Sequence, residues 1–363
     1  MAPTVQKAVI IQQDRSVALR EIAVPKPGPD EILVKVVAAA QNPVDWKTAL
    51  YGKRAGVVSG CDFSGIVEEI GSNVPHGLRS VGERIAGLVH GGRQLCGAFS
   101  EYLVTYADFV VHLPDTWSFE DAAQLGIAPL SALMALYDLL ELYEFPWHES
   151  AIANPPTPQD TPHGRRHSIL ISGGASSVGQ YAVQFAKLSG LYVIATASER
   201  NFSLVRSLGA DVVVDYHDPV RAAKQIRDAA PGPIEHAIDC VSMGTSFEIV
   251  AASLDGKSTI AYLSLGSYPL VEGARILSGV VFDYFGKDYD FPLPFTASPE
   301  VTAKGRRWVR LLSELLVKTN LRPNPVLILP RGLADVAQGF QYMTEGKVSA
   351  EKITYRIADT VNE

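Results

Sequence analysis

A short glycine- and serine-rich turn between an apolar run and a helical pattern constrains the fold of this chain most. The apolar run is 169–172, and the turn that follows reads Gly-Gly-Ala-Ser-Ser-Val-Gly at 173–179. Small residues let backbone N–H groups approach a phosphate closely, and the predicted helix at 178–189 directs the positive end of its dipole to the same place. The turn therefore predicts a binding site for a dinucleotide pyrophosphate.

Strands and helices alternate along the chain after this turn. The expected strands are 168–172, 192–197, 212–215, 235–239 and 258–263, and the expected helices are 178–189, 201–208, 219–229 and 244–253. Alternation at this spacing predicts an α/β fold with a doubly wound parallel sheet and helices on both faces. The tail adds expected helices at 299–319 and 333–345 and strands at 326–329 and 352–357. We expect these last strands to return to the first domain.

The residues before the turn have a different pattern, in which short β-branched runs alternate with Gly and Pro. Between residues 6 and 115 such runs lie at 32–37, 65–70, 83–88 and 99–104. This pattern predicts a β-rich, barrel-like domain. A chain of 363 residues is long for one hydrophobic core. We therefore expect two domains, one formed by residues 1–127 and 290–363 and the other by residues 128–289.

Residues 118–167 join the two patterns. Ser118, with Asp121 three residues later, predicts a capped helix start, and the helical pattern continues to about residue 143 with an expected kink at Pro129. Prolines among polar residues at 145–167 exclude a regular helix or central strand there. We expect this stretch to be an exposed loop.

The composition argues against several classes of function. A formal net charge of -7 does not suit nucleic-acid binding, which needs a concentrated basic face. The cysteines at 61, 96 and 240 include no C-x-x-C pair, so neither a disulfide framework nor a zinc ribbon is indicated. The most apolar stretch, 125–137, is shorter than the ~20 residues of a membrane span. We expect a cytoplasmic protein with no nucleic-acid or membrane partner.

The end of the second predicted strand indicates which dinucleotide binds. In an NAD site this strand ends in an acidic residue that accepts hydrogen bonds from the ribose 2′-OH. Here the strand ends at Ser198, followed by Glu199, Arg200 and Asn201. Without a carboxylate at the strand tip a 2′-phosphate can be accommodated, although a Glu199 side chain turned inward would repel it. The sequence favours NADPH over NADH.

The order of β-rich domain, dinucleotide fold and return to the first domain resembles the medium-chain dehydrogenase/reductase superfamily. The resemblance runs from about Lys7 to Ile357, and the combination of motifs is specific although each is weak alone. The motifs are Asn42–Lys47, Gly60–Val67, Val81–Ile85, Gly97–Tyr102, Gly209–Asp211 and Asp215–Tyr216. The resemblance implies a GroES-like catalytic domain beside a Rossmann domain.

The positions of the zinc ligands in the zinc-dependent branch of this superfamily carry other residues here. That branch places Cys at Asn42, His at Cys61 and a further Cys near Ile127. Tetrahedral zinc needs about three protein ligands, and Cys61 alone could serve as one. The structural zinc lobe is likewise reduced to the thiol of Cys96. We therefore expect no metal, and we expect Cys61 and Cys96 to be small buried hydrophobes.

Without zinc, the chain resembles the quinone reductase and enoyl reductase branch, and within it the fungal trans-acting enoyl reductases of polyketide biosynthesis. The features that carry this resemblance are Asn42–Lys47, the proline-rich segment, Ser198 with Asn201-Phe202, and Gly346–Lys352. The resemblance implies that hydride moves from NADPH to the β-carbon of an activated double bond. The implied substrate is an enoyl thioester, small or carrier-bound, with a polyketide synthase as a possible partner.

The same resemblance assigns residues to the cofactor. The expected contacts are Gly174, Ala175, Ser176, Ser177, Val178 and Gly179 around the pyrophosphate, Ser198, Asn201 and Tyr216 around the 2′-phosphate, Val241 and Leu265 near the nicotinamide, and Lys352 as a further contact. Related quinone reductases often carry Lys at the position of Asn201. The predicted phosphate pocket is therefore less charged than usual.

Candidate catalytic residues lie in the Asn42–Lys47 motif and just after it. Hydride addition creates an enolate, so the site must stabilise an oxyanion and deliver a proton to the α-carbon. Lys47, Asn42 and Tyr51 are the candidates for these roles, and Lys47 could instead contact the nicotinamide ribose. Asp45 would orient Lys47 or cap the local turn.

Partner and substrate stay open at this point. An acyl carrier presents acidic helices and phosphopantetheine, so Arg54, Lys53 and Arg93 are the expected docking residues. The alternatives are a quinone or small-enone reductase of detoxifying type and a non-catalytic NADPH-binding protein, because a fold does not dictate function. Monomer and homodimer are both compatible with the sequence.

Overall fold

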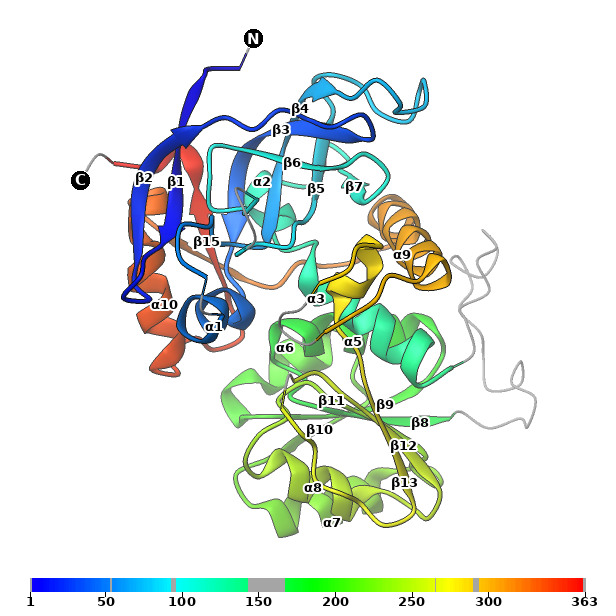
Figure 1. Ribbon diagram of the computed structural model, residues 1–363. Helices are drawn as coiled ribbons and strands as arrows, with labels where there is room; N and C mark the ends of the chain where they lie inside the picture. The colour runs from blue at the N-terminus through cyan, green and yellow to red at the C-terminus, as the bar shows by residue number, and fades with distance from the viewer. Residues whose placement is uncertain are drawn as a thin grey trace. The chain divides into compact units, whose positions relative to one another are not determined.

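The chain folds into two compact units, which the computed structural model describes over residues 2–52, 54–92, 96–142, 167–264, 266–289 and 294–361. Met1–Ile127 and Phe282–Glu363 form the first unit, and Ala128–Val281 form the second (Figure 1). Each unit has its own sheet and its own hydrophobic core. The proline-rich segment predicted to be a loop lies outside the described residues, apart from its last residue, His167.

The first unit contains a mixed sheet with the strand order β14-β15-β3-β4-β5-β7, and β6 also pairs with β3. Its strands are β3 (Glu31–Ala40), β4 (Asp62–Ile70), β5 (Arg84–Leu88), β6 (Tyr102–Tyr106), β7 (Val110–His112), β14 (Val326–Leu329) and β15 (Lys352–Arg356). Strand β15 pairs antiparallel with β3. The last strand of the chain therefore lies in the same sheet as β3, the sheet in which the sequence analysis expected it.

Elements that the sequence reading missed complete this unit. A hairpin of β1 (Val5–Ile11) and β2 (Val17–Ala23) forms a separate two-stranded sheet. Helix α1 (Pro43–Tyr51) replaces the turn expected there. Its start was legible, because Asn42 is an N-cap residue, Pro43 follows at the first helical position, and Asp45 accepts the Asn42 N–H at 2.7 Å.

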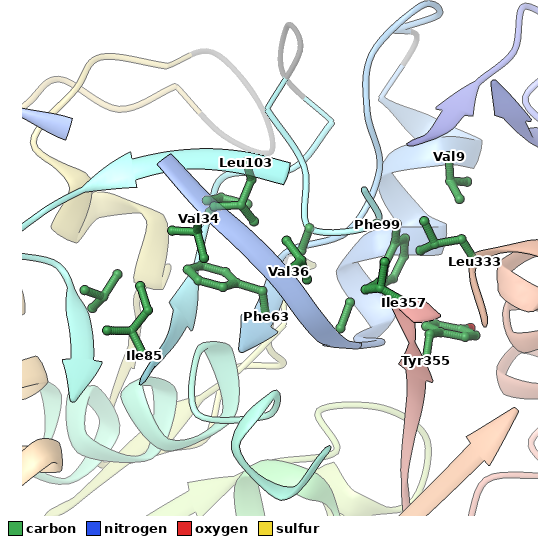
Figure 2. Close-up of a cluster of buried hydrophobic side chains, with 14 of the residues drawn as sticks. Val9, Val34, Val36, Phe63, Ile85, Phe99, Leu103, Leu333, Tyr355 and Ile357 are labelled. Carbon is green, nitrogen blue, oxygen red and sulfur yellow. The ribbon is translucent and has the colours of Figure 1, made fainter. Parts of the chain in front are cut away.

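The core of the first unit joins side chains from distant parts of the sequence. Figure 2 shows Val34 and Val36 of β3 beside Phe63 of β4, with Phe99 and Tyr355 at the other end of the cluster. The rings of Phe99 and Tyr355 meet edge to face, with centroids 5.4 Å apart. The C-terminal strand is therefore part of the same core as the N-terminal half of the chain.

The helical segment that follows is interrupted earlier than predicted. Ser118 caps α2 (Phe119–Ala122), because its Oγ accepts the Asp121 N–H at 3.0 Å, which confirms the predicted cap. The break comes before α3 (Ile127–Leu133), which continues as a π-helix over Met134–Leu139. Pro129 therefore lies in the first turn of α3, where its missing N–H has no helical partner to lose, and the predicted kink there is wrong.

The second unit is a doubly wound sheet, as predicted. Its strands are all parallel, in the order β10-β9-β8-β11-β12-β13, with bounds β8 (Ser168–Ser172), β9 (Tyr192–Ala197), β10 (Val212–Asp215), β11 (His236–Asp239), β12 (Ser258–Tyr262) and β13 (Ala274–Ser278). Helices on both faces are α5 (Ser177–Leu188), α6 (Phe202–Ser207), α7 (Pro219–Ala229) and α8 (Ser246–Ser253). Figure 1 shows α7 and α8 on one face and α5 and α6 on the other. Edge strand β13 was not predicted.

The boundary between the second unit and the tail lies at Val281, whereas the sequence placed it after residue 289. Aromatic contacts explain the difference. Phe282 stacks on His90 with centroids 4.0 Å apart, and Phe285 meets Phe109 edge-on at 4.8 Å. These rings hold the start of the tail in the first unit, ahead of helices α9 (Pro299–Lys318) and α10 (Val336–Thr344), which match the predicted tail helices.

Candidate functional site

The glycine- and serine-rich turn lies between β8 and α5 and is held by backbone contacts to the neighbouring strand. Gly173 adopts φ +78°, a conformation that favours glycine, and its N–H donates to Thr196 Oγ1 at 2.9 Å. The N–H of Gly174 donates to the Thr196 carbonyl at 2.8 Å. Ser176 caps the helix, because its Oγ accepts the Gly179 N–H at 3.0 Å. Strand β9 therefore fixes the turn at the point where α5 begins.

Close packing leaves no space for larger residues in this turn. A Cβ added to Gly179 would lie 2.1 Å from the Gly173 carbonyl oxygen, and one added to Gly174 would lie 2.8 Å from Ala195 Cβ. The Ala175 carbonyl accepts the Gln180 side-chain amide at 3.0 Å. The structure brings six of the predicted cofactor residues together here, namely Gly174, Ala175, Ser176, Ser177, Val178 and Gly179. A turn of this shape, at the N-terminus of a helix, suits a pyrophosphate.

A groove of about 920 Å³ lies at the ends of β9 and β10 in the same unit. Ser198 and Tyr216 line it, as do Glu199 and Arg200. Asn201 lies beside Ser198, and its side-chain amide donates to Ser198 Oγ at 3.2 Å. The residues predicted for the 2′-phosphate therefore lie together around one groove.

Two further basic side chains, His217 and Arg221, line this groove, and sequence reasoning missed both. His217 stacks on Tyr216 with centroids 4.6 Å apart, and its Nδ1 lies 2.7 Å from Asp215 Oδ1. Burial alone would raise the pKa of the Asp215 carboxyl. The hydrogen bonds and the charge of His217 outweigh burial, so the net effect is a lowered pKa. Arg221 is in the first turn of α7, behind the cap residue Asp218. The signal that could have pointed to them is that a helix begins directly after β10, which brings the residues of its first turn to the groove.

A buried carboxylate organises the loop after β11. Asp239 is fully buried and accepts hydrogen bonds from the Val241 N–H at 3.0 Å, the Ser242 N–H at 2.8 Å and the Ser246 hydroxyl at 2.9 Å. Val241, predicted near the nicotinamide, is 41% exposed. A Cβ on Gly173 would lie 2.5 Å from its side chain, so Val241 lies against the glycine- and serine-rich turn. Leu265, also predicted there, lies outside the described residues.

The first unit contains a buried polar cluster at the start of α1. Lys352 of β15 is 3% exposed, and its Nζ donates to Asn42 Oδ1 at 2.5 Å and lies 3.4 Å from Asp62 Oδ2. The other carboxylate oxygen of Asp62 accepts the Ile127 N–H at 2.8 Å. Lys352, which the sequence assigned to the cofactor, therefore has its ammonium group bound to side chains of its own unit. Asp62 was not singled out, although it lies within the Gly60–Val67 motif that carried the family resemblance.

Asp45 and Cys61 belong to the same cluster, and burial governs both. Burial, and secondarily the charge of Asp62, raises the pKa of Asp45 to about 7, against the hydrogen bond from the Asn42 N–H. Burial also raises the pKa of the Cys61 thiol well above its usual value and raises the pKa of Asp62, where the Lys352 charge opposes it.

The remaining catalytic candidates lie on the outer side of α1. Lys47 Nζ is 5.6 Å from the centroid of the Trp46 ring, and Tyr51 is 63% exposed. The structure therefore separates the four predicted residues into a buried pair, Asn42 and Asp45, and a pair that solvent or a ligand can reach. Of the predicted docking residues, Arg54 is described and lines a cavity of about 490 Å³, while Lys53 and Arg93 lie outside the described residues.

Two general classes of feature are absent from the described part of the chain. It holds no group of three or more His, Cys, Asp or Glu side chains placed to bind a metal ion. It also contains no helix of sufficient length and apolar character to cross a membrane.

The chain matches two family models and many known proteins. Residues 28–115 match the alcohol dehydrogenase GroES-like domain, and residues 177–281 match the zinc-binding dehydrogenase family. A trans-enoyl reductase of Aspergillus clavatus, ccsC, is 35% identical over 91% of this chain and 90% of its own length. The trans-enoyl reductase ACTTS2 of Alternaria alternata is 35% identical over 97% of this chain and 99% of its own length.

Solved structures agree on the fold. A quinone oxidoreductase from Coxiella burnetii superimposes with a TM-score of 0.67 at 23% identity, covering 97% of this chain and 99% of that one. A mycobacterial protein complexed with NADPH superimposes with a TM-score of 0.70 at 21% identity, covering 96% of this chain and 99% of that one. The expected architecture, a GroES-like domain with a Rossmann sheet, is confirmed. The chain is an oxidoreductase that belongs to the medium-chain dehydrogenase/reductase superfamily, in the family of the trans-enoyl reductases.

Proposed function

We propose that this protein is an NADPH-dependent reductase that saturates the double bond of an enoyl thioester without zinc and acts in trans beside a polyketide synthase. The observation that carries the proposal is the 35% identity to a trans-enoyl reductase across 97% of the chain, which includes both the dinucleotide turn and the α1 cluster. The fold alone is shared with quinone oxidoreductases and does not choose a substrate.

The chemistry divides between the two units. Bound NADPH would supply the hydride, held by the turn at 173–179 and by the groove beside Ser198. Reduction of a conjugated thioester develops negative charge on the carbonyl oxygen and needs a proton at the α-carbon. In our proposal Lys47 or Tyr51, on the accessible side of α1, donates to that oxygen or delivers that proton, while Asn42 and Asp45 hold the helix in place.

The donor set of the first unit supports chemistry without zinc. Asn42 offers an amide oxygen already bound by the Lys352 ammonium, which would repel a divalent cation at the same place. Zinc prefers a thiolate, and burial holds the Cys61 thiol in its neutral form by raising its pKa. Lys352 thus supplies the positive charge of this cluster.

A direct test is turnover with three substrate types. We expect the protein to oxidise NADPH with 2-enoyl thioesters and to leave quinones and simple alkenals largely unreduced. Quinone turnover above thioester turnover would instead support a detoxifying reductase. Binding of NADPH without turnover of any of the three substrates would support the alternative of a non-catalytic NADPH-binding protein.

The preference for NADPH over NADH can be tested at the end of β9, where Ser198 lies. Ser198→Asp places a carboxylate where the 2′-phosphate would lie, so KM for NADPH should rise about tenfold while KM for NADH falls. Ser207→Asp adds the same charge on α6 and does not line the groove, so it serves as the matched control. Equal use of both cofactors by the unmodified protein would contradict the proposed preference for NADPH.

The partner proposal concerns Arg54. Its cavity is also lined by Lys287, an exposed cation whose Nζ lies 4.7 Å from the Tyr106 ring centroid, and by the carboxylates of Glu31 and Asp288. Reversal of charge by Arg54→Glu should slow reduction of a carrier-bound thioester about tenfold and leave a free pantetheine thioester unaffected. Turnover of the carrier-bound thioester by this variant at the rate of the unmodified protein would exclude Arg54 as a docking residue. Monomer or homodimer, and a cytoplasmic location, stay predictions.

A further inference from the structure

Lys352 connects three segments of the first unit through buried polar contacts. Its ammonium group bonds Asn42, the N-cap of α1, and pairs with Asp62 at the start of β4. Asp62 in turn accepts the N–H of Ile127, the last residue before the chain enters the second unit. The Lys352 and Asp62 side chains are 3% and 0% exposed, so water does not compete for these contacts.

Helix α1 depends on this cluster because it has few other anchors. It is nine residues long, its fully buried residues are Asp45, Thr48 and Ala49, and its larger apolar side chains Val44 and Trp46 are only half-buried. A helix this short is marginal on its own, and because its apolar side chains are only partly buried, its cap and polar contacts help to fix its position. At its N-terminus those contacts are the Asn42 N–H on Asp45, at 2.7 Å, and the Lys352 ammonium on the Asn42 side chain.

We propose that Lys352 is a positioning residue for the reductase reaction, which fixes the first turn of α1 and thereby the place of Lys47 and Tyr51. The inference rests on the proposed function only for its kinetic consequence, because the contacts themselves do not depend on the substrate. Removal of Lys352 leaves Asp62 as a buried carboxylate without its cation and Asn42 without its side-chain partner. Misplacement of a catalytic group by about 1 Å can lower turnover about a hundredfold.

The cluster also sets the protonation of its members. Asp45 faces the carboxyl of Asp62, the thiol of Cys61, the ammonium of Lys352 and the phenol of Tyr355. One cation therefore serves two carboxyl groups, and loss of that cation makes ionisation of either one harder. A variant without Lys352 should show an altered pH profile of kcat as well as a lower value.

The experiment compares Lys352→Met, the neutral double variant Lys352→Met/Asp62→Asn, and Lys352→Arg. The single variant leaves a buried unpaired carboxylate and can fail to fold. The double variant removes both charges and retains an oxygen that can accept the Ile127 N–H, so its thermal midpoint should stay near that of the unmodified protein. Lys318→Met removes a lysine from the exposed Glu314 pair on α9 and is the matched control.

For the double variant we expect kcat to fall about a hundredfold with a shifted pH profile, and the dissociation constant of NADPH to remain unchanged, because the predicted turn and groove lie in the second unit. Lys352→Arg keeps the charge and should recover a large part of kcat. Hydrogen exchange of the backbone amides of α1 should be faster in the double variant, whether or not any substrate is reduced. The Lys318→Met control should match the unmodified protein in each measurement.

Two outcomes would overturn the positioning role. A folded double variant with unchanged kcat, pH profile and α1 exchange would make the Lys352–Asp62 pair purely structural. A double variant with weakened NADPH binding and normal kcat would make Lys352 the cofactor contact that the sequence suggested. Failure of the unmodified protein to reduce any enoyl thioester would refute the proposed function, while the exchange measurement would still decide the role of Lys352.

Discussion

The glycine- and serine-rich turn of the second unit and the α1 cluster of the first unit are built by opposite means. The turn consists of backbone groups and small side chains that are neighbours in sequence, fixed by contacts to the adjacent strand at Thr196. The cluster consists of buried charged and polar side chains from positions as far apart as Asn42 and Lys352. The turn leaves no room for a Cβ at its glycines, so it is sensitive to added volume. The cluster holds buried charged groups, so it is sensitive to their protonation and to the balance of charge.

The largest effect is expected at the turn. Gly179→Ala would place a Cβ 2.1 Å from the Gly173 carbonyl oxygen, so the turn must open. We expect NADPH affinity to fall by a hundredfold or more, which corresponds to roughly 3 kcal/mol. Fluorescence titration with NADPH measures this change. Gly232→Ala is the control in the same unit, since an added Cβ there meets nothing within 4 Å, and an equal loss in both variants would contradict the packing argument.

The cluster should respond to pH where the turn does not. The pKa of Asp45 is raised from 3.8 to about 7, so its contribution to stability is complete below about pH 4 and is lost as pH rises from there to about 7. Between about pH 5 and about pH 8 we expect the free energy of unfolding of the unmodified protein to drop by on the order of 3 kcal/mol more than that of Asp45→Asn.

Urea unfolding at the two pH values measures this difference. The Asn side chain keeps an oxygen for the Asn42 N–H, so the helix start survives in the variant. Asp115→Asn changes a carboxylate at the surface, with a side chain that is fully exposed, and serves as the control. Parallel pH dependence in the unmodified protein and Asp45→Asn would show that Asp45 is not the group responsible.

The smallest effect is expected at two helix caps, Ser118, which caps α2, and Ser176, which caps α5 in the predicted binding turn. Ser176→Ala and Ser118→Ala each remove one hydroxyl that accepts a backbone N–H at a helix start. Each should lower the free energy of unfolding by about 1 kcal/mol. Ser176→Ala alone should also weaken NADPH binding, by about tenfold. Thermal unfolding with and without NADPH measures both quantities, and equal NADPH stabilisation of the two variants would remove Ser176 from the phosphate site.

The same contrast explains how far the sequence could be read. The turn, the alternating strands and the groove residues Ser198 and Tyr216 follow from local patterns, because each lies at the end of a predicted strand. The Asp62–Lys352 pair could not be found in this way, since its partners are 290 residues apart and join only when β15 pairs with β3. Helix α1 was missed for a different reason, because its cap signal was present and was read as a turn.

The strand that carries Lys352 has a consequence for the order in which this protein folds. The second unit is one continuous stretch, so it can form as soon as it has been synthesised. The first unit cannot, because its sheet needs strands β14 and β15, and Lys352 of β15 is the cation that pairs with Asp62. Its N-terminal half therefore emerges from the ribosome with an unfinished sheet edge and an unneutralised acid in its core. The α1 cluster can form only after residues 326–356 have been synthesised, so a chain truncated before them would keep the parallel sheet of the second unit but would lack the completed cluster.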